Sequence, residues 1–264
     1  MIKLLKKAEK DCHISFKQIF SIFLVIIFTS AVVIFNLFNS DAVLAITCGY
    51  AYRKLPIYRV ERADKLIAIS FDCAWGNEFT QKLLENMQFY GAKCTFFMVS
   101  FWAEKYPDEV KKIIEYGHEI GTHSKTHSHM SKQSVDAINE ELIYSKKVIE
   151  DITGQKVELF RAPFGEYNNN LIDCAEKCGL YTIQWDVDSL DWKNLTAQEI
   201  AQRVISRVKS GSIILCHNNG MHTAESLPLI FTDLTARGYK FVKISDLIYK
   251  ENYIMMSDGT QVKQ

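Results

Sequence analysis

The sequence lacks an excess of charge of either sign. Its 264 residues include 31 basic and 31 acidic side chains, so the formal net charge is zero. Proteins that bind nucleic acid usually carry a clustered excess of lysine and arginine. We therefore expect no nucleic-acid partner. The sequence also lacks internal repeats and low-complexity linkers, which predicts one globular domain after the N-terminal region.

A disulfide framework is lacking as well. The seven cysteines are an odd number and do not have the close, regular spacing of a disulfide-stabilised fold. With 48% hydrophobic residues, a chain of this length can bury an ordinary core without cross-links. We therefore expect free thiols rather than disulfides at Cys12, Cys48, Cys73, Cys94, Cys174, Cys178 and Cys216.

One long uncharged run lies near the N-terminus. Residues 19–38, "IFSIFLVIIFTSAVVIFNLF", are just long enough to cross a bilayer as a helix, and five lysines precede them. Because positive charge is retained on the cytoplasmic side, we expect a single-pass anchor in the cell membrane and an extracytoplasmic remainder. One alternative is a cleaved signal peptide with "VLA" at 43–45 as its cleavage site. The other is a buried helix of a soluble core, which the lysine-rich flank disfavours.

Strand-like and helix-like segments alternate after the linker. "IYRV" and "KLIAISF" resemble two paired strands joined by a turn. The expected helices, which alternate with further short apolar strands, are 78–90, 107–116, 135–153, 169–178, 197–209 and 223–237. This alternation predicts an α/β fold with a parallel sheet covered by helices, either a barrel or an open sheet. The expected parts are a basic tail (1–18), a transmembrane helix (19–38), a linker (39–55), a catalytic domain (56–250) and a C-terminal tail (251–264).

Polar side chains follow five of the predicted strands, where parallel α/β folds place their chemistry. They are Asp72 after "ISF", His123 and His127 after "EIGT", Arg161 after "VELF", Asp188 and Asp191 after "TIQW", and His217 after "IILC". Each of these residues alone is a weak signal, because isolated Asp and His residues are usually caps or surface groups. Five such strand ends at one edge of a sheet predict a functional site.

These residue types predict metal-assisted hydrolysis of an amide or ester. His123 and His127 are four residues apart in "HSKTH" and can face one ion while leaving positions for water, as catalytic zinc sites do. Asp72 can accept a proton from that water, and Arg161 can orient Asp72 and lower its pKa. His217 can protonate the leaving group, and we expect Asp188 to keep its imidazole cationic.

The motifs "SFDCAWG", "HSKTH", "RAPFG", "DSLDW" and "IILCH" resemble, in order and spacing, the five NodB-homology motifs of polysaccharide deacetylases. The resemblance covers residues 57–250, and the first motif is similar to the sporulation (PdaB-like) branch. It implies a distorted (β/α) barrel with fewer than eight strands, and a divalent metal, usually zinc. By this resemblance Asp72 is the base, Arg161 orients it, His217 is the acid, Asp188 is the partner of the acid, and His123 and His127 bind the metal. It further implies that the backbone N–H at Phe164 contributes to the oxyanion hole and that Trp192 forms a wall of the acetyl pocket; we also expect Trp75 to contact the substrate.

Cys73 departs from the family pattern, in which a second Asp is usually the third metal ligand. A thiolate binds zinc at about 2.3 Å, so Cys73 can replace that carboxylate. The alternative is that Cys73 is a small packing residue and that the two histidines hold the metal with water.

The sequence therefore predicts a membrane-anchored, zinc-dependent deacetylase of a cell-wall aminosugar polymer, with peptidoglycan as the expected substrate and sporulation as the expected setting. Two alternatives remain. One is a glycan-binding envelope protein whose catalytic site has decayed, and the other is a carbohydrate O-acetyl esterase on the same fold.

Overall fold

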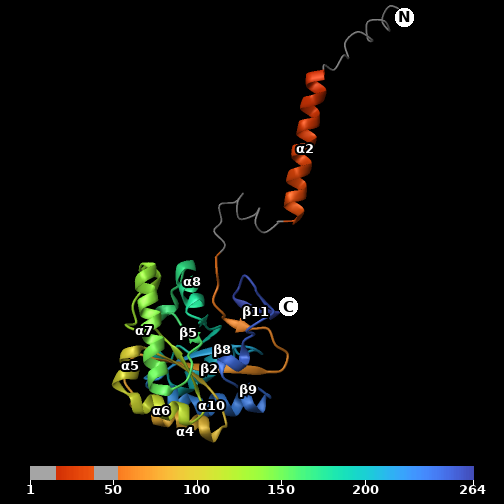
Figure 1. Cartoon of the computed structure of the whole chain (residues 1–264). Helices are drawn as coiled ribbons and strands as arrows, with labels where there is room; N and C mark the ends of the chain where they lie inside the picture. Colours follow the sequence, from red (N-terminus) through yellow and green to blue (C-terminus); the bar gives the residue numbers. More distant parts are fainter. Residues whose placement is uncertain (1–15, 39–52) are drawn as a thin grey trace, which may run out of the picture. The chain divides into compact units, whose positions relative to one another are not determined.

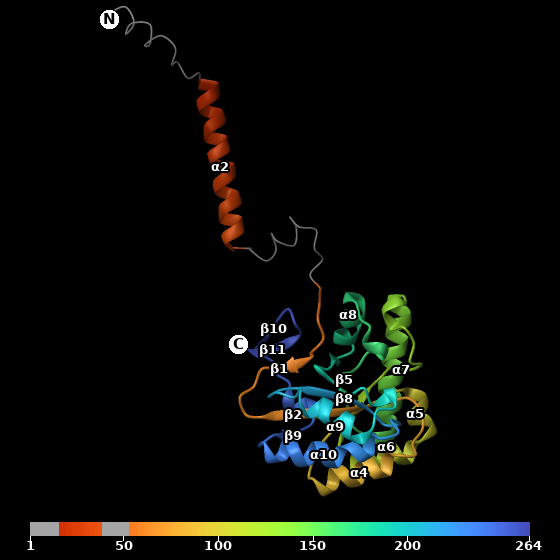
Figure 2. The ribbon, with the colours of Figure 1, turned by 180° about the vertical axis from the view of Figure 1, so that it is seen from behind.

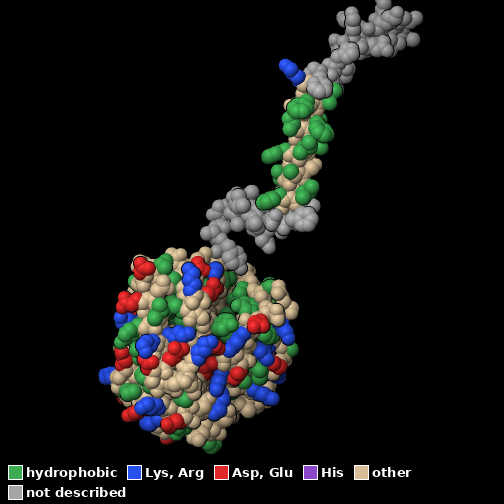
Figure 3. All heavy atoms as spheres, in the orientation of Figure 1, with side chains coloured by type: hydrophobic (Ala, Val, Ile, Leu, Met, Phe, Trp, Pro, Cys, Tyr) green, Lys and Arg blue, Asp and Glu red, His purple; other side chains and the backbone are tan. Residues whose placement is uncertain are grey.

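The computed structural model describes residues 16–38 and 53–264 and divides the chain into two units, Met1–Arg53 and Lys54–Gln264 (Figure 1). In the first unit, the apolar run forms the expected helix, α2 (Phe16–Phe38), whose apolar side chains are visible in Figure 3. Among the residues whose side chains are described, no helix is both long and apolar enough to cross a membrane. Most of the basic tail and of the linker, with the cleavage site at 43–45, lie outside the described residues. The membrane anchor stays a prediction.

The second unit is built around a parallel sheet with the strand order β6-β5-β4-β3-β2-β8-β7, and β9 also pairs with β2. Its strands are β2 (Leu66–Cys73), β3 (Thr95–Met98), β4 (Glu119–Thr122), β5 (Leu159–Phe160), β6 (Tyr181–Thr182), β7 (Val187–Asp188), β8 (Ile213–His217) and β9 (Lys240–Phe241). Within residues 53–264, β6 and β7 end the order and do not pair with each other. The sheet is a curled, open half-barrel. It has eight strands with β9, where the family resemblance implied fewer than eight.

Helices cover the outside of this sheet. They are α4 (Thr80–Phe89), α5 (Ser100–Lys105), α6 (Pro107–Glu115), α7 (Val135–Thr153), α8 (Asn169–Lys177), α9 (Ala197–Ile205), α10 (Thr223–Ala236) and α11 (Ile244–Leu247). Helix α10 packs between α4 and α9, and α7 packs against α5, α6 and α8 (Figures 1 and 2). Local sequence signals set several helix ends: Thr196 and Glu199 form the expected capping box of α9, and Gly154 ends α7 in the left-handed conformation.

Strand β2 separates two hydrophobic clusters, and its alternation decides which way each side chain faces. Ile67, Ile69, Phe71 and Cys73 belong to the large cluster. Ala68, between them, belongs to the smaller cluster with Phe97 and Ile213. Asp72 lies four residues after Ala68, so the two side chains face the same side of the sheet. The carboxylate and the thiol that follows it therefore leave β2 on opposite faces.

Two expectations about the ends of the domain are wrong. β1 (Arg59–Val60) does not pair with β2 but lies parallel to β11 (Thr260–Lys263), which in turn pairs with β10 (Tyr253–Met255) in a separate three-stranded sheet. The segment 251–264, expected to be a tail, supplies two of these strands. Both strands are short, and β11 ("TQVK") has no apolar run of the kind that marks a buried strand. The globular unit therefore extends to Gln264.

Candidate active site

A cavity of about 540 Å³ opens at the carboxyl ends of the parallel strands. It collects Asp72 from β2, His123 and His127 from the loop after β4, Asp188 from β7 and His217 from β8. The remaining lining residues are mainly aromatic or apolar: Ala74, Trp75, Phe164, Gly165, Trp185, Trp192, Leu215 and Asn219. Most of the predicted site residues therefore meet in one place.

Asp72 is a buried carboxylate held by a buried cation. Arg161, fully buried, donates from Nη1 to Asp72 Oδ1 at 2.8 Å and from Nη2 to the carbonyl of Gln184 at 3.2 Å. The guanidinium carbon also lies 4.2 Å from the ring centroid of Phe97, so the group is fixed from two sides. Burial alone would raise the pKa of Asp72, but the charge of Arg161 and the electrostatic interactions with His123 and His217 outweigh burial and lower the pKa. Asp72 is thus an oriented, ionised base at neutral pH.

His123 presents one imidazole nitrogen to the cavity. Its Nδ1 lies 2.8 Å from the carbonyl oxygen of Arg161, which can only accept a hydrogen bond, so Nδ1 carries the proton and Nε2 is left free. Nε2 is 3.5 Å from Asp72 Oδ2. Burial lowers the pKa of His123, and it lowers that of His127 to about 4. Both imidazoles are therefore neutral at pH 7, the form that binds metal.

His127 lies beside His123 in a tight loop. Its backbone has φ of 56°, its N–H donates to Ser124 Oγ at 2.9 Å, and the two imidazole centroids are 5.0 Å apart. The rings of Trp75 and Phe164 both contact the His127 imidazole edge-on. Their centroids lie 5.0 Å and 4.6 Å from the imidazole centroid. The predicted pair of histidines is thus assembled as expected, with an aromatic surround.

The partner of His217 is Asp191 and not Asp188, as the sequence analysis expected. Nδ1 of His217 lies 2.7 Å from Asp191 Oδ1, and the His217 backbone N–H donates to Asp191 Oδ2 at 2.7 Å. Thr223 Oγ1 donates to the same oxygen at 2.6 Å. Asp191 is fully buried, and both of its carboxylate oxygens accept hydrogen bonds. Burial opposes protonation of His217, but the hydrogen bond and charge of Asp191 outweigh it and raise the pKa. Asp188 contributes to this shift only through its charge.

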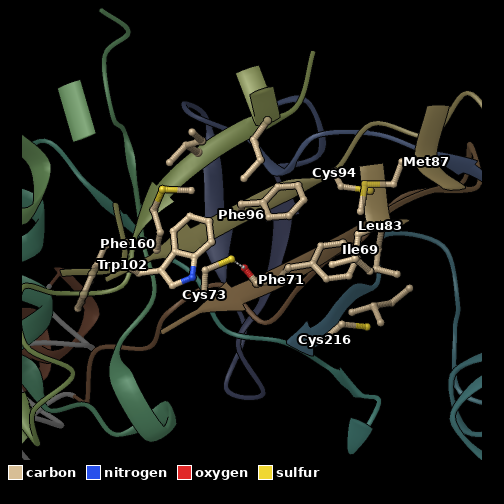
Figure 4. Close-up of a cluster of buried hydrophobic side chains, with 14 of the residues drawn as sticks. Ile69, Phe71, Cys73, Leu83, Met87, Cys94, Phe96, Trp102, Phe160 and Cys216 are labelled. Carbon is tan, nitrogen blue, oxygen red and sulfur yellow. Dashed lines mark hydrogen bonds between the residues drawn. The ribbon is translucent and has the colours of Figure 1, made fainter. Parts of the chain in front are cut away.

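Cys73 does not face the cavity. Its side chain is fully buried in the large hydrophobic cluster, with Sγ 3.8 Å from the carbonyl of Phe71 (Figure 4). Figure 4 shows the thiol pointing among Phe71, Phe96 and Trp102. Burial and the neighbouring charge of Asp72 raise the pKa of Cys73 well above its ordinary value, so it is a neutral thiol. The expectation that Cys73 is a metal ligand is wrong in this geometry, because residues 72 and 73 alternate across β2.

Three aromatic side chains at the cavity are more than half exposed: Trp75 (58%), Phe164 (55%) and Trp192 (57%). Phe164 has φ of 61°, a strained value for a non-glycine residue, and its ring stacks on His129 at 4.3 Å. Trp185 also lines the cavity but was not among the predicted residues, although its position at the end of "LYTIQW" was a signal for it. The exposed rings offer flat surfaces for sugar rings.

The chemistry of the two histidines fits a divalent metal. The free Nε2 of His123 and the neutral state of His127 suit an ion at the cavity floor. Among the described residues, however, no group of three or more His, Cys, Asp or Glu side chains is arranged to hold one. A metal held by these two imidazoles would take its remaining ligands from water.

The comparisons show the family. The polysaccharide deacetylase family model matches residues 59–183. A peptidoglycan-N-acetylglucosamine deacetylase of Bacillus cereus is 33% identical over 196 residues, which cover 72% of this chain and 92% of that protein. The uncharacterized protein YlxY of Bacillus subtilis is 34% identical over 73% of this chain, and the match spans 60% of its own length. The chain belongs to the polysaccharide deacetylase family.

A solved structure adds a contrast. A mutant of BA3943, described as a CE4 family pseudoenzyme with restored enzymatic activity, is 35% identical and superposes with a TM-score of 0.71, covering 73% of this chain and 70% of that one. The wild-type BA3943 of Bacillus anthracis, described as a CE4 family pseudoenzyme, is 31% identical, with a TM-score of 0.72 over 79% of this chain and 73% of its own. Relatives of this chain thus include both deacetylases and a pseudoenzyme.

Proposed function

We propose that the protein is a metal-dependent hydrolase that removes N-acetyl groups from a cell-wall aminosugar polymer, with peptidoglycan as the substrate. The observation that carries this proposal is the pair of oriented catalytic groups on neighbouring strands. Asp72 and His217 are register partners in β2 and β8; Asp72 is ionised and paired with Arg161, and His217 has a raised pKa and is hydrogen-bonded to Asp191. A groove that only binds glycans does not require an acid, a base or a residue that orients each of them.

In this mechanism Asp72 takes a proton from the attacking water, and Arg161 keeps the carboxylate ionised and aimed. His217 donates a proton from Nε2 to the leaving amine, because Asp191 holds Nδ1 and supports the imidazolium. As the family resemblance implies, the backbone N–H of Phe164 would contribute to the oxyanion hole and Trp192 would border the acetyl group. A divalent ion held by His123 and His127, with zinc as the proposed metal, supplies Lewis acidity and lowers the pKa of water.

The test is acetate release by the purified full chain from N-acetylglucosamine oligomers, peptidoglycan and O-acetylated xylan, with and without added zinc. We expect zinc-stimulated release from the aminosugar substrates. Faster release from the O-acetyl esters would instead establish the esterase alternative. No release from any substrate with zinc present would overturn the proposal.

Asp191→Asn is expected to shift the pH dependence of this activity. The pKa of His217 is raised in the native protein, so its acid form persists to higher pH; without the Asp191 charge that pKa falls. The alkaline limb of the kcat–pH profile should therefore move to lower pH, and kcat at neutral pH should fall by about 10²-fold. Asp188→Asn should move that limb much less, because Asp188 acts on His217 only through its charge. Equal shifts in the two variants would contradict the assignment of Asp191 as the partner.

The glycan-binding alternative has one observation in its favour: residue 73 points into the core, and the described residues contain no group of three or more His, Cys, Asp or Glu side chains arranged to hold a metal. It predicts oligosaccharide binding without zinc-dependent turnover, an outcome that the acetate assay separates from catalysis. We further propose an extracytoplasmic location with α2 as the anchor, which membrane fractionation of the expressed full chain tests. A role in sporulation stays a prediction from the family resemblance.

A further inference from the structure

A carboxylate of α7 binds the loop between the two histidines. Glu141, 8% exposed, accepts hydrogen bonds at Oε2 from the backbone N–H groups of Lys125 at 2.8 Å and Thr126 at 2.9 Å. Its Oε1 accepts a third hydrogen bond from Thr126 Oγ1 at 2.6 Å. One side chain therefore fixes two of the three residues that separate His123 from His127.

Glu141 occupies the buried face of its helix, where an apolar residue is expected. The buried residues of α7 recur at intervals of three and four along one face: Ile138, Glu141, Leu142, Ser145 and Ile149. A carboxylate at such a position costs free energy unless it is hydrogen-bonded. The preceding residue, Glu140, is exposed and pairs with the side chain of Lys125 at 2.7 Å. Glu141 instead receives the backbone of the loop, and these contacts compensate its burial.

The loop requires such support because its backbone adopts an uncommon conformation. Ser124 has φ of 81° and His127 has φ of 56°, values in the left-handed region that residues other than glycine seldom adopt. Conformations of this kind persist where the surrounding contacts over-determine them. The hydrogen bond from the His127 N–H to Ser124 Oγ closes the loop from within, and Glu141 fixes it from α7.

We propose that Glu141 is a positioning residue for metal binding: through the amides of Lys125 and Thr126 it keeps His127 beside His123. Glu141 is not among the residues that line the cavity, so it acts through the loop rather than on the ion or the substrate. Its loss should weaken metal binding without removing either imidazole. The inference rests on the proposed role of the two histidines as metal ligands.

The experiment measures the zinc Kd of the full chain and, in the metal-free chain, the hydrogen exchange of the Lys125 and Thr126 amides. Glu141→Leu removes both acceptor oxygens, so we expect Kd to rise by at least about tenfold and both amides to lose their protection. Glu141→Gln keeps an oxygen for the two backbone donors, and its amide can donate to the Thr126 hydroxyl. Kd of this variant should stay within about threefold of the native value.

Three further variants separate positioning from stability and from charge. Leu142→Ala opens a cavity in the large hydrophobic cluster from the same helix, so it should lower stability while Kd changes by less than about threefold. Glu140→Leu removes the exposed pair with Lys125 and should change neither measurement. Glu141→Asp keeps the charge but is one methylene shorter, so it should also weaken zinc binding. It replaces Glu141→Leu if that variant does not fold.

An unchanged zinc Kd in folded Glu141→Leu or Glu141→Asp would overturn the inference. An equal rise of Kd in Leu142→Ala would also overturn it, because Glu141 would then contribute only to stability. If the native chain bound no zinc, the proposed metal-dependent function would fail separately. Amide exchange would then decide whether Glu141 fixes the loop, and native protection in Glu141→Leu would refute it.

Discussion

Replacing Asp72 by asparagine is expected to abolish measurable acetate release while glycan binding persists. The substitution keeps the shape of the side chain but removes the negative charge that accepts the proton of water. General base catalysis typically contributes 10²–10⁴-fold, so we expect kcat to fall by about that factor. Kd for an N-acetylglucosamine oligomer should change by less than about threefold, because the exposed aromatic rings that would carry the sugar are untouched.

The same substitution leaves a buried cation without its counter-charge. Arg161 is fully buried, and removing one member of a buried ion pair typically costs about 3–5 kcal/mol. Folding of Asp72→Asn must therefore be verified by urea unfolding. His217→Gln is the second test: it removes the proposed acid and leaves the buried Asp191 carboxylate with the residue 217 N–H and Thr223 as donors, so its folding is verified in the same way. Asp151→Asn is the surface control. If folded Asp72→Asn turned over substrate at close to the native rate, the assignment of Asp72 as the base would be refuted.

The candidate site was largely predictable because the chemistry lies at strand ends. Asp72, His123, Arg161 and His217 each follow a short apolar segment, and in a parallel sheet the ends of such segments meet at one edge. The surface of residues 53–264 that Figure 3 shows mixes acidic and basic side chains, in keeping with the balanced composition. Helix positions follow from the same alternation of apolar segments, whereas the strand order was not predicted from it.

The error over the partner of His217 has a local conformational cause. Asp188 and Asp191 are three residues apart in "DSLDW", and sequence spacing does not distinguish between them. In the structure, Leu190 adopts a left-handed conformation with φ of 55°, and a short 3-10 turn (Asp191–Lys193) follows it. This turn carries Asp191 back beneath His217 and leaves Asp188 in the cavity wall. A left-handed conformation is strained for leucine, and the residue type does not predict it.

The error over Cys73 came from the length of a strand. The sequence analysis ended the strand near Phe71, which left residue 73 free to turn toward the cavity. Pairing with β3 continues for two more residues, Asp72 with Phe97 and Cys73 with Met98. The alternation of β2 therefore reaches residue 73 and directs it into the core. Strand ends are set by the neighbouring strand, and that neighbour is distant in sequence.

Cys73→Asp is expected to destabilise the protein strongly without creating a metal ligand. The new carboxylate would lie in the hydrophobic cluster, beside Phe71, Phe96 and Trp102 (Figure 4). An unpaired polar group buried in such a place costs several kcal/mol, and we expect the free energy of unfolding to fall by more than about 3 kcal/mol. Cys73→Ala should lower it by only about 1–2 kcal/mol and leave zinc content unchanged, because the thiol touches no ligand.

The measurement is urea unfolding beside zinc content for native protein, Cys73→Ala, Cys73→Ser and Cys73→Asp. Cys73→Ser separates polarity from charge, since its hydroxyl is neutral and no larger than the thiol. A Cys73→Asp variant that is as stable as the native protein and binds more zinc would show that the end of β2 can rotate residue 73 into the cavity. In that case the two-histidine site would be an incomplete form of a three-ligand site, and the thiol at position 73 would limit metal affinity. Strong destabilisation with unchanged zinc would instead establish that β2 holds this residue in the core and that metal binding depends on His123 and His127.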